Sequence, residues 1–492
     1  MSTPVGTVLD SQPATLSLSK RRVVKNSVAQ MLSQILAGGS KALAAVMVAR
    51  ALGPEGMGVF SLSWTLAGTV SFLAVFGLDY LMIREMARHR DRRTLENSFT
   101  LACLLAGAVA VMLVAAPLLV GAHTPVIQAL IGAAAYIALS APVLVLRASF
   151  HAAEKMEYES AATTIEGLFA VAGVAVALVL GWGVAGAMGG LALGRLAALV
   201  ASLRLYRKLW GAFHPRWDPT DWKPMLKASI PMAASYAFTA VYMRFDVVLL
   251  AGLRPASEVG LYGAVSVIIL TVPIFASSFG GSLYPVLSRA GSADHPEVQS
   301  VFASSVRLLF MASIPMATGL FLLAGPILKL TYGSDFTSAA HALMVLSLVL
   351  PMRFVNNLAG HVLTAVDRQG KRTTAVIVAA TANLGLNLVF IPLWGFMGAA
   401  YATLITEAVL TALMIPALKP LRYRSLGVLE GAAIALVMGA VVVSVPGGVI
   451  GQLGAGAAVF LLGATALFLR GRVTPRAKGV PVAKPTLEGG LA

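Results

Sequence analysis

Residues 161–206 read AATTIEGLFAVAGVAVALVLGWGVAGAMGGLALGRLAALVASLRLY, which is two long apolar stretches joined by a short turn at Gly181-Trp182-Gly183. The stretches cover residues 161–181 and 186–206. About 20 helical residues, each rising 1.5 Å, cross a hydrocarbon core of roughly 30 Å. This stretch therefore predicts a pair of transmembrane helices.

Apolar stretches of the same length recur along almost the whole chain. With 58% hydrophobic and 12% charged residues and a mean hydropathy of +0.82, the composition lies well outside the soluble range. We predict an all-α, polytopic membrane protein of about fourteen transmembrane helices. Their approximate limits are 28–49, 58–82, 98–121, 126–148, 161–181, 186–206, 229–252, 259–284, 304–328, 339–364, 374–393, 397–418, 427–446 and 449–470.

The net charge of +16 is distributed very unevenly between the two sides of the predicted membrane. An even number of spans places both termini on one side, and that side holds 30 of the 37 Lys and Arg residues. The opposite loops hold only Arg50, Arg254 and Lys329. By the positive-inside rule both termini are predicted to be cytoplasmic, and the basic charge does not indicate a nucleic-acid partner.

Three pairs of matching segments indicate an internal duplication. Each pair occupies equivalent places before or after corresponding spans: 52–60 and 253–262, 153–155 and 366–368, and 183–187 and 395–399. Six spans per repeat preserve orientation, so we predict two parallel six-helix lobes around a central cavity, with two additional C-terminal helices. The predicted divisions are 1–24 cytoplasmic tail, 25–206 first lobe, 207–228 linker, 229–418 second lobe, 419–470 additional helices and 471–492 cytoplasmic tail.

The predicted linker, 207–228, contains Trp210, Trp217 and Trp222 among basic residues. Tryptophan and cationic side chains concentrate at the level of lipid headgroups. We therefore expect this segment to lie at the cytoplasmic membrane interface.

Four cations interrupt the predicted spans, and each costs about 2.5–3.5 kcal/mol near the membrane centre unless it faces a cavity or a partner. They are Lys41, Arg195, Arg244 and Arg353. Lys41 lies close enough to a span end to extend toward the interface. Arg195 follows Gly194 and is equally well explained as a packing residue. All four, Lys41, Arg195, Arg244 and Arg353, are candidates for binding an anionic substrate.

Acids and amides accompany these cations. Asp246 and Glu407 are the central carboxylates and candidate ion-coupling residues, although Asp246 could instead pair with Lys41 or Arg353. The amide candidates for substrate binding are Gln34, Asn356, Asn357, Asn383 and Asn387. Interhelical hydrogen bonding is the alternative role for these amides. Together with the arginines they would line a cavity for sugar hydroxyls and a diphosphate, because a guanidinium donates two hydrogen bonds to one anion.

The sequence carries no signature of a nucleotide site, a metal site or a disulfide framework. The chain lacks a Walker A motif, its histidines do not form a metal-ligand pattern, and its one cysteine, Cys103, excludes a disulfide framework. Residues 1–20 are polar and lack the apolar core of a signal peptide. We therefore expect a transporter rather than an enzyme, without a cofactor or a metal.

Three motifs give the chain a recognisable resemblance over about residues 23–420. They are Ala-Arg-Ala-Leu-Gly-Pro-Glu-Gly-Met-Gly (49–58), Arg-Phe-Asp (244–246) with Glu-Val-Gly-Leu-Tyr (258–262), and the stretch from Asn383 to Ala400. In this order they resemble the polysaccharide-biosynthesis flippases of the multidrug/oligosaccharidyl-lipid/polysaccharide exporter superfamily.

The resemblance implies a multi-pass protein of the bacterial inner membrane that moves undecaprenyl-diphosphate-linked repeat units to the outer leaflet by alternating access. It also implies polysaccharide polymerase and chain-length machinery as partners. The alternatives are a cation-coupled drug antiporter, a lipid II flippase and a membrane glycosyltransferase or polymerase. An antiporter of this superfamily would carry an acid on the first helix, where this chain has Lys41, and the short external loops disfavour an enzyme.

Overall fold

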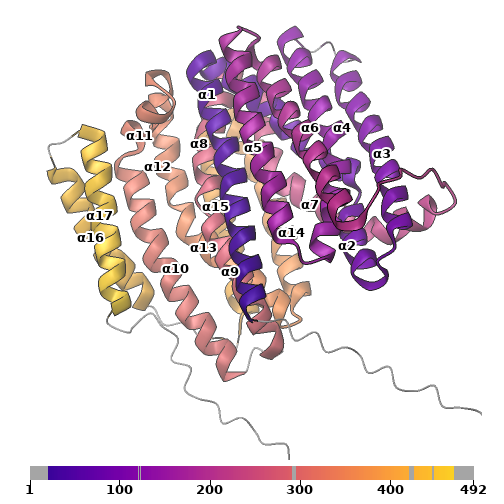
Figure 1. Cartoon of the computed structure of the whole chain (residues 1–492). Coiled ribbons are helices and arrows are strands. Elements are labelled where there is room, and N and C mark those ends of the chain that lie inside the picture. Colours follow the sequence, from indigo (N-terminus) through magenta and orange to yellow (C-terminus); the bar gives the residue numbers. More distant parts are fainter. Residues whose placement is uncertain are drawn as a thin grey trace, which may run out of the picture.

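The computed structural model describes residues 20–119, 121, 123–290, 295–419, 421, 426–445 and 448–469, which are helical apart from short connections. Long helices stand side by side in one bundle (Figure 1). The helices are α1 (Lys20–Val75), α2 (Leu78–His89), α3 (Arg92–Leu119), α4 (Thr124–Ala152), α5 (Met156–Val179), α6 (Gly183–Trp210), α7 (Trp222–Leu253), α8 (Ala256–Thr271), α9 (Ile274–Ala290), α10 (Pro296–Leu322), α11 (Ala324–Thr331), the 3-10 helix η1 (Ser334–Ala339), α12 (Ala340–Ser347), α13 (Val349–Ala365), α14 (Gln369–Trp394), α15 (Phe396–Ala417), α16 (Leu426–Ser444) and α17 (Gly448–Leu469).

Helix α1 contains the first predicted span and most of the second, which meet at a kink, and the second span continues into α2 after a break at Phe76 and Gly77. Gly53 has φ 64° and ψ −169°, a conformation that favours glycine, and Pro54 follows it at the start of the second segment. Proline suits this position because the first turn of a helix needs no amide donor. We call the end of the bundle that contains this kink the kink end.

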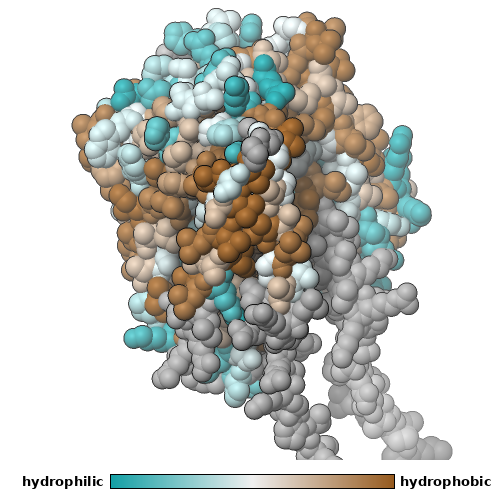
Figure 2. Space-filling model, turned by 90° about the vertical axis from the view of Figure 1, so that its left-hand side faces the viewer, coloured by the Kyte–Doolittle hydropathy of each residue, from teal (hydrophilic) through white to brown (hydrophobic). Residues whose placement is uncertain are grey.

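Two other predicted spans are broken rather than continuous. The eighth consists of α8 and α9, which are separated at Val272 and Pro273, and the tenth is formed by η1 and α12 followed by α13, with a bend of 45°. Within the described residues, nine helices are long and apolar enough to cross a membrane, or ten if the bent pair is one span. The count is below fourteen partly because α1 holds two spans and α8 and α9 are short. Apolar residues predominate across the middle of the face shown in Figure 2, and the chain is a multi-pass membrane protein.

The helices form two lobes with an appended pair. Helices α1 and α3–α6 pack together as the predicted first lobe, and α9, α10 and α12–α15 pack together in the predicted second lobe, while α7 and α8 of that lobe lie mainly against α1. The pair α16 and α17 stands at the edge of the bundle against α10 (Figure 1). Arg307 of α10 forms a two-pronged ion pair with Glu430 of α16. Glycines 427 and 431 allow close contact, because a Cβ atom on either would lie within 2.7 Å of the α10 backbone.

The lobes touch most closely where α1 crosses α8 near the kink end. A Cβ atom on Gly58 would lie 1.8 Å from the Ala256 carbonyl oxygen, and one on Gly260 would lie 1.8 Å from the Pro54 carbonyl oxygen. Small residues permit such backbone approach between membrane helices. We call this crossing the glycine seam. It joins the lobes on one side of the space between them.

The linker between the lobes is attached to the start of α3. Asn97 donates to the Asp218 carbonyl at 2.9 Å and accepts from the Trp222 indole, also at 2.9 Å. Glu96 accepts from the His214 amide at 3.2 Å and lies 3.5 Å from the Arg216 guanidinium. Both α3 side chains are buried. The linker is therefore held by specific polar contacts with the first lobe, a role that its composition did not predict.

Candidate functional site

A cavity of about 430 Å³ lies between the lobes, beyond the glycine seam. Helices α1, α7, α8, α12, α13, α14 and α15 contribute its walls. Five predicted site residues line it: Arg244, Asp246, Arg353, Asn383 and Glu407. The sequence therefore identified residues that the fold brings together from four separate helices, α7, α13, α14 and α15.

Arg244 reaches across the space between the lobes. It belongs to α7, yet a Cβ atom on Gly68 of α1 would lie 2.5 Å from its Nη1 atom. Glycine at position 68 therefore leaves room for the guanidinium against α1. Among the described residues, no carboxylate lies within ion-pair distance of Arg244, and no hydrogen-bond acceptor is assigned to it. Its positive charge faces the cavity, where Asp246 on the same wall acts on it electrostatically without forming an ion pair.

Arg353 has a partner in the same cavity wall. Its Nη2 atom lies 3.5 Å from Oε2 of Glu407, a carboxylate that is only 4% exposed. Asn356 donates to the other carboxylate oxygen at 3.0 Å and also to Thr411 at 3.0 Å. Glu407 is therefore held from two sides, while Arg353 is only partly neutralised by one long contact.

Asp246 takes part in a different polar chain. The Tyr262 hydroxyl donates to its Oδ2 atom, and that hydroxyl lies 3.2 Å from Thr403 Oγ1. Neither of the partners expected for Asp246, Lys41 and Arg353, forms an ion pair with it within the described part of the chain. Tyr262 and Thr403 were not singled out from the sequence, because neutral hydroxyl residues carry no signal of cavity exposure.

The remaining predicted amides lie elsewhere. Asn357 donates to the Arg353 carbonyl at 3.1 Å, and Asn387 donates to Asn383 Oδ1 at 3.0 Å. Asn383 itself donates to Thr406 at 3.2 Å, linking α14 to α15. Gln34 lies on an exposed part of α1 and is absent from the cavity walls. Asn383 and Asn356 thus form interhelical bonds, whereas Asn357 and Asn387 bond within their own helices.

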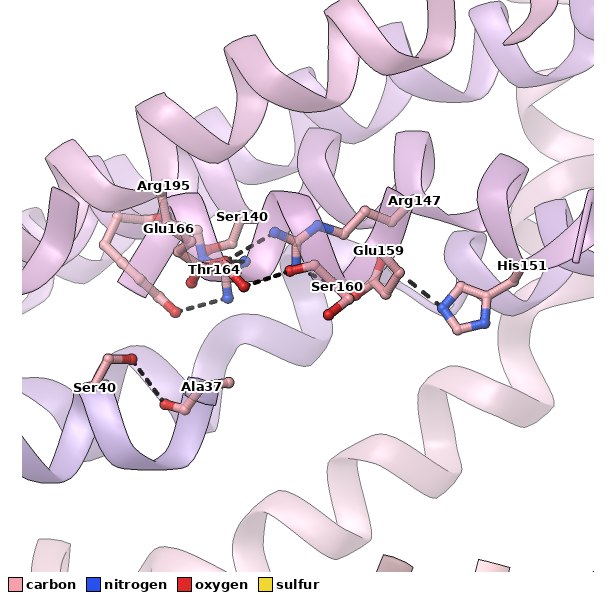
Figure 3. Close-up of polar contacts among 11 residues, drawn as sticks. Ala37, Ser40, Ser140, Arg147, His151, Glu159, Ser160, Thr164, Glu166 and Arg195 are labelled. Atoms are coloured by element: carbon pink, nitrogen blue, oxygen red, sulfur yellow. Dashed lines mark hydrogen bonds and ion pairs between the residues drawn. The ribbon is translucent and has the colours of Figure 1, made fainter. Parts of the chain in front are cut away.

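Arg195 belongs to an ion network inside the first lobe and not to the central cavity. It contacts Glu166 at 3.2 Å, and Glu166 also accepts from Arg147 at 3.0 Å (Figure 3). Arg147 continues the network to Glu159 at 3.4 Å. These four residues from α4, α5 and α6 neutralise one another. Arg147 and Glu159 were missed because they lie near the ends of their predicted spans.

Lys41 lines a second, much smaller cavity of about 20 Å³ beside the ion network. Its Nζ atom lies 5.7 Å from the centre of the Trp64 ring. Trp64 lines this small cavity and the central cavity alike. The indole therefore stands as a partition between Lys41 and the space that Arg244 faces.

The sequence matches known families over the regions that build this site. A family model described as "Polysaccharide biosynthesis protein" matches residues 23–291, which is more than half of the chain. The chain belongs to this family. A second model, described as "MatE", matches residues 231–393.

Curated relatives carry related names. A "Putative O-antigen transporter" of Shigella flexneri is 24% identical over 412 residues, covering 80% of this chain and 96% of the relative. The "Probable low-salt glycan biosynthesis flippase Agl15" of Haloferax volcanii is 27% identical over 173 residues, and the match spans 35% of this chain and only 37% of that protein.

Solved structures share the fold of this polysaccharide biosynthesis family member. Lipid II flippase MurJ in an inward closed conformation aligns with a TM-score of 0.74 at 15% identity, covering 92% of this chain and all of that one. An inward-facing MATE family multidrug resistance transporter aligns with a TM-score of 0.55 at 15% identity over 84% of this chain. At these identities the likeness concerns the fold alone.

Proposed function

We propose that this protein is a flippase that moves undecaprenyl-diphosphate-linked oligosaccharide repeat units across the bacterial inner membrane by alternating access. The observation that carries the proposal is Arg244, an unpaired cation on the wall of a cavity between two membrane-embedded lobes. A bare cation in such a place is costly unless an anion approaches it. Membership of the polysaccharide biosynthesis family makes a lipid diphosphate the appropriate anion.

The arginines of the cavity are assigned to the diphosphate, and its amide and hydroxyl residues are assigned to the sugars. Arg244 and Arg353 bind the diphosphate, with Arg353 exchanging its long contact with Glu407 for the substrate. Asn383 and the hydroxyls of Thr403 and Thr406 face the same space and hydrogen-bond sugar hydroxyls. A volume of about 430 Å³ lies in the range of ordinary ligand sites, while the polyprenyl tail remains in the bilayer.

Coupling to an ion is assigned to Asp246 and Glu407. Each carboxylate has neutral hydrogen-bond donors that keep it in place: Tyr262 for Asp246, and Asn356 for Glu407. Binding of a proton or sodium ion at Glu407 would weaken its hold on Arg353. Loading of the ion and binding of the diphosphate by Arg353 are thereby linked in one wall of the cavity.

The kink end faces outward in this proposal and both termini are cytoplasmic, because the basic loops lie at the other end. The two arginines expected outside stabilise helix ends: Arg50 donates to the Thr331 carbonyl at 2.8 Å, and Arg254 donates to the Pro392 carbonyl at 3.1 Å. Cations favour helix C-termini. The glycine seam then closes the outer side of the cavity. Polymerase and chain-length proteins would act on the released product.

The test uses a strain deleted for this gene. Lipid-linked saccharides are extracted and assigned to a leaflet, and the strain is complemented with wild type, Arg244→Gln or Arg204→Gln. Arg204 is an exposed cation on α6 that does not line the cavity, so it serves as the matched control.

We expect one intact lipid-linked repeat unit to accumulate in the inner leaflet, with rescue by wild type and Arg204→Gln but not by Arg244→Gln. Accumulation of an unfinished glycan would point to a glycosyltransferase. Accumulation of lipid II would point to the peptidoglycan precursor as substrate, and unchanged lipids with altered drug sensitivity would point to an antiporter.

A further inference from the structure

The α1 wall of the central cavity is aromatic where the facing walls are polar. Phe60 and Trp64 lie one helical turn apart on α1 and both line the cavity. Residues four apart share one face of a helix, so both rings lie on the face of α1 that lines the cavity. An aromatic surface is unsuited to a diphosphate, yet it lies within the space assigned to the substrate.

The Trp64 ring is held by a chain of contacts that begins outside the cavity. It packs edge-to-face against Tyr136 of α4, with ring centres 5.1 Å apart. Tyr136 accepts a hydrogen bond from Arg195 at 2.7 Å, and the guanidinium lies 4.8 Å from the centre of the Tyr136 ring. Glu166 in turn fixes Arg195. The buried ion network therefore acts as a rigid support for one aromatic side chain.

The Trp64 side chain and the Arg244 guanidinium lie against neighbouring turns of α1. Gly68, over which the Arg244 guanidinium lies, is one turn along α1 from Trp64. One turn of helix rises about 5.4 Å. A ligand that places an anion at Arg244 therefore brings the group bonded directly to that anion against the indole.

We propose that Trp64 is a stacking platform for the pyranose bonded directly to the diphosphate of the lipid-linked substrate. This inference rests on the proposed function and adds a sugar-binding residue to it. A pyranose presents a face of C–H groups that is apolar, and an aromatic ring offers a flat, electron-rich surface for that face. Because Trp64 is fixed beforehand, little conformational freedom is lost when the sugar binds.

The experiment compares two probes on the purified full-length protein in nanodiscs. Undecaprenyl diphosphate presents the anion alone, and undecaprenyl-diphosphate N-acetylglucosamine adds one pyranose. The affinity of each is measured for wild type, Trp64→Leu, Trp64→Phe and Trp182→Leu. Trp182 is 64% exposed in the turn between α5 and α6, so it controls for the loss of an indole elsewhere.

We expect wild type and Trp182→Leu to bind the sugar-bearing probe roughly tenfold more tightly, as burial of about 50 Å² of apolar surface predicts. In Trp64→Leu the ratio of the two affinities falls to about one, and in Trp64→Phe most of the preference remains. Arg244→Gln weakens both probes alike and leaves the ratio intact.

A Trp64→Leu protein that keeps the tenfold preference would overturn the proposal, as would one that loses affinity for both probes equally. A wild-type protein that binds both probes with equal affinity would overturn it while leaving the flippase function standing. A wild-type protein that binds neither probe would overturn both, so the two failures are distinguishable.

Discussion

Alanine at position 260 tests whether the glycine seam holds the cavity closed at the kink end. A Cβ atom there would lie 1.8 Å from the Pro54 carbonyl oxygen and 2.9 Å from the Gly58 amide nitrogen. Ordinary van der Waals contact begins at 3.4 Å, so α1 and α8 must separate by about 1.6 Å. Both close atoms belong to the backbone, which leaves no flexible side chain to move aside.

The expected cost follows from this overlap. Overpacking of a tight contact costs typically about 1–3 kcal/mol, whereas alanine improves helix propensity over glycine by up to about 1 kcal/mol. The gain in helix propensity stabilises the open and closed states equally, because α8 is helical in both. The overlap, however, acts only while the seam is closed, so the closed state loses roughly 5- to 150-fold in relative population.

The assay measures the distance between nitroxide labels on either side of the seam. Labels are placed at Glu55→Cys and Leu253→Cys, both exposed positions, after the native Cys103 has been changed to serine. We expect Gly260→Ala to increase the long-distance population. Gly252→Ala is the control, because a Cβ atom there would meet nothing within 4 Å. An unchanged distance distribution in Gly260→Ala would refute the view that this crossing determines closure.

Three other predictions test parts of the structure outside the cavity. Glu166→Gln leaves buried Arg195 without an ion-paired carboxylate and Arg147 with Glu159 alone, and should destabilise the protein by about 3–5 kcal/mol; an unchanged thermal unfolding temperature would contradict the ion network. Asn97→Ala removes the hydrogen bonds that hold the linker, so amide hydrogen exchange in the linker should accelerate while exchange in the spans stays the same. A double-mutant cycle on Arg307→Ala and Glu430→Ala should give a coupling free energy above about 1 kcal/mol, and additive effects would show that the pair does not fasten α16 to α10.

The positions of the helices were largely predictable, because apolar length and helix-breaking residues act locally. The turn at Gly181 and Gly183, for example, separates α5 from α6 where the sequence indicated. The merging of two spans into α1 was not predictable, since Gly53 and Pro54 usually signal an end and here permit only a kink. The predicted domain boundaries and the orientation of the termini stay predictions.

Partners of the charged residues were much harder to infer. Arg195 and Arg244 look alike in sequence, each a lone cation within an apolar span. They differ because packing brings Glu166 of the neighbouring helix within 3.2 Å of Arg195 and no described carboxylate comes that close to Arg244. Such a difference depends on the relative depth and rotation of helices, which local sequence patterns do not encode.

An arginine without a carboxylate partner indicates a ligand site only when its surroundings leave its charge unused by the fold. Arg50 also lacks a carboxylate partner among the described residues, yet it donates to carbonyls at the end of α11, so its charge is used by the fold. Arg195 is neutralised, and Arg353 is partly so through one contact of 3.5 Å. Arg244 has none of these arrangements and lies beside an open cavity. Asp246 on the same wall acts on Arg244 only at longer range than an ion pair, and a buried cation without a paired carboxylate destabilises the folded protein, so a ligand that supplies an anion at Arg244 stabilises the arrangement.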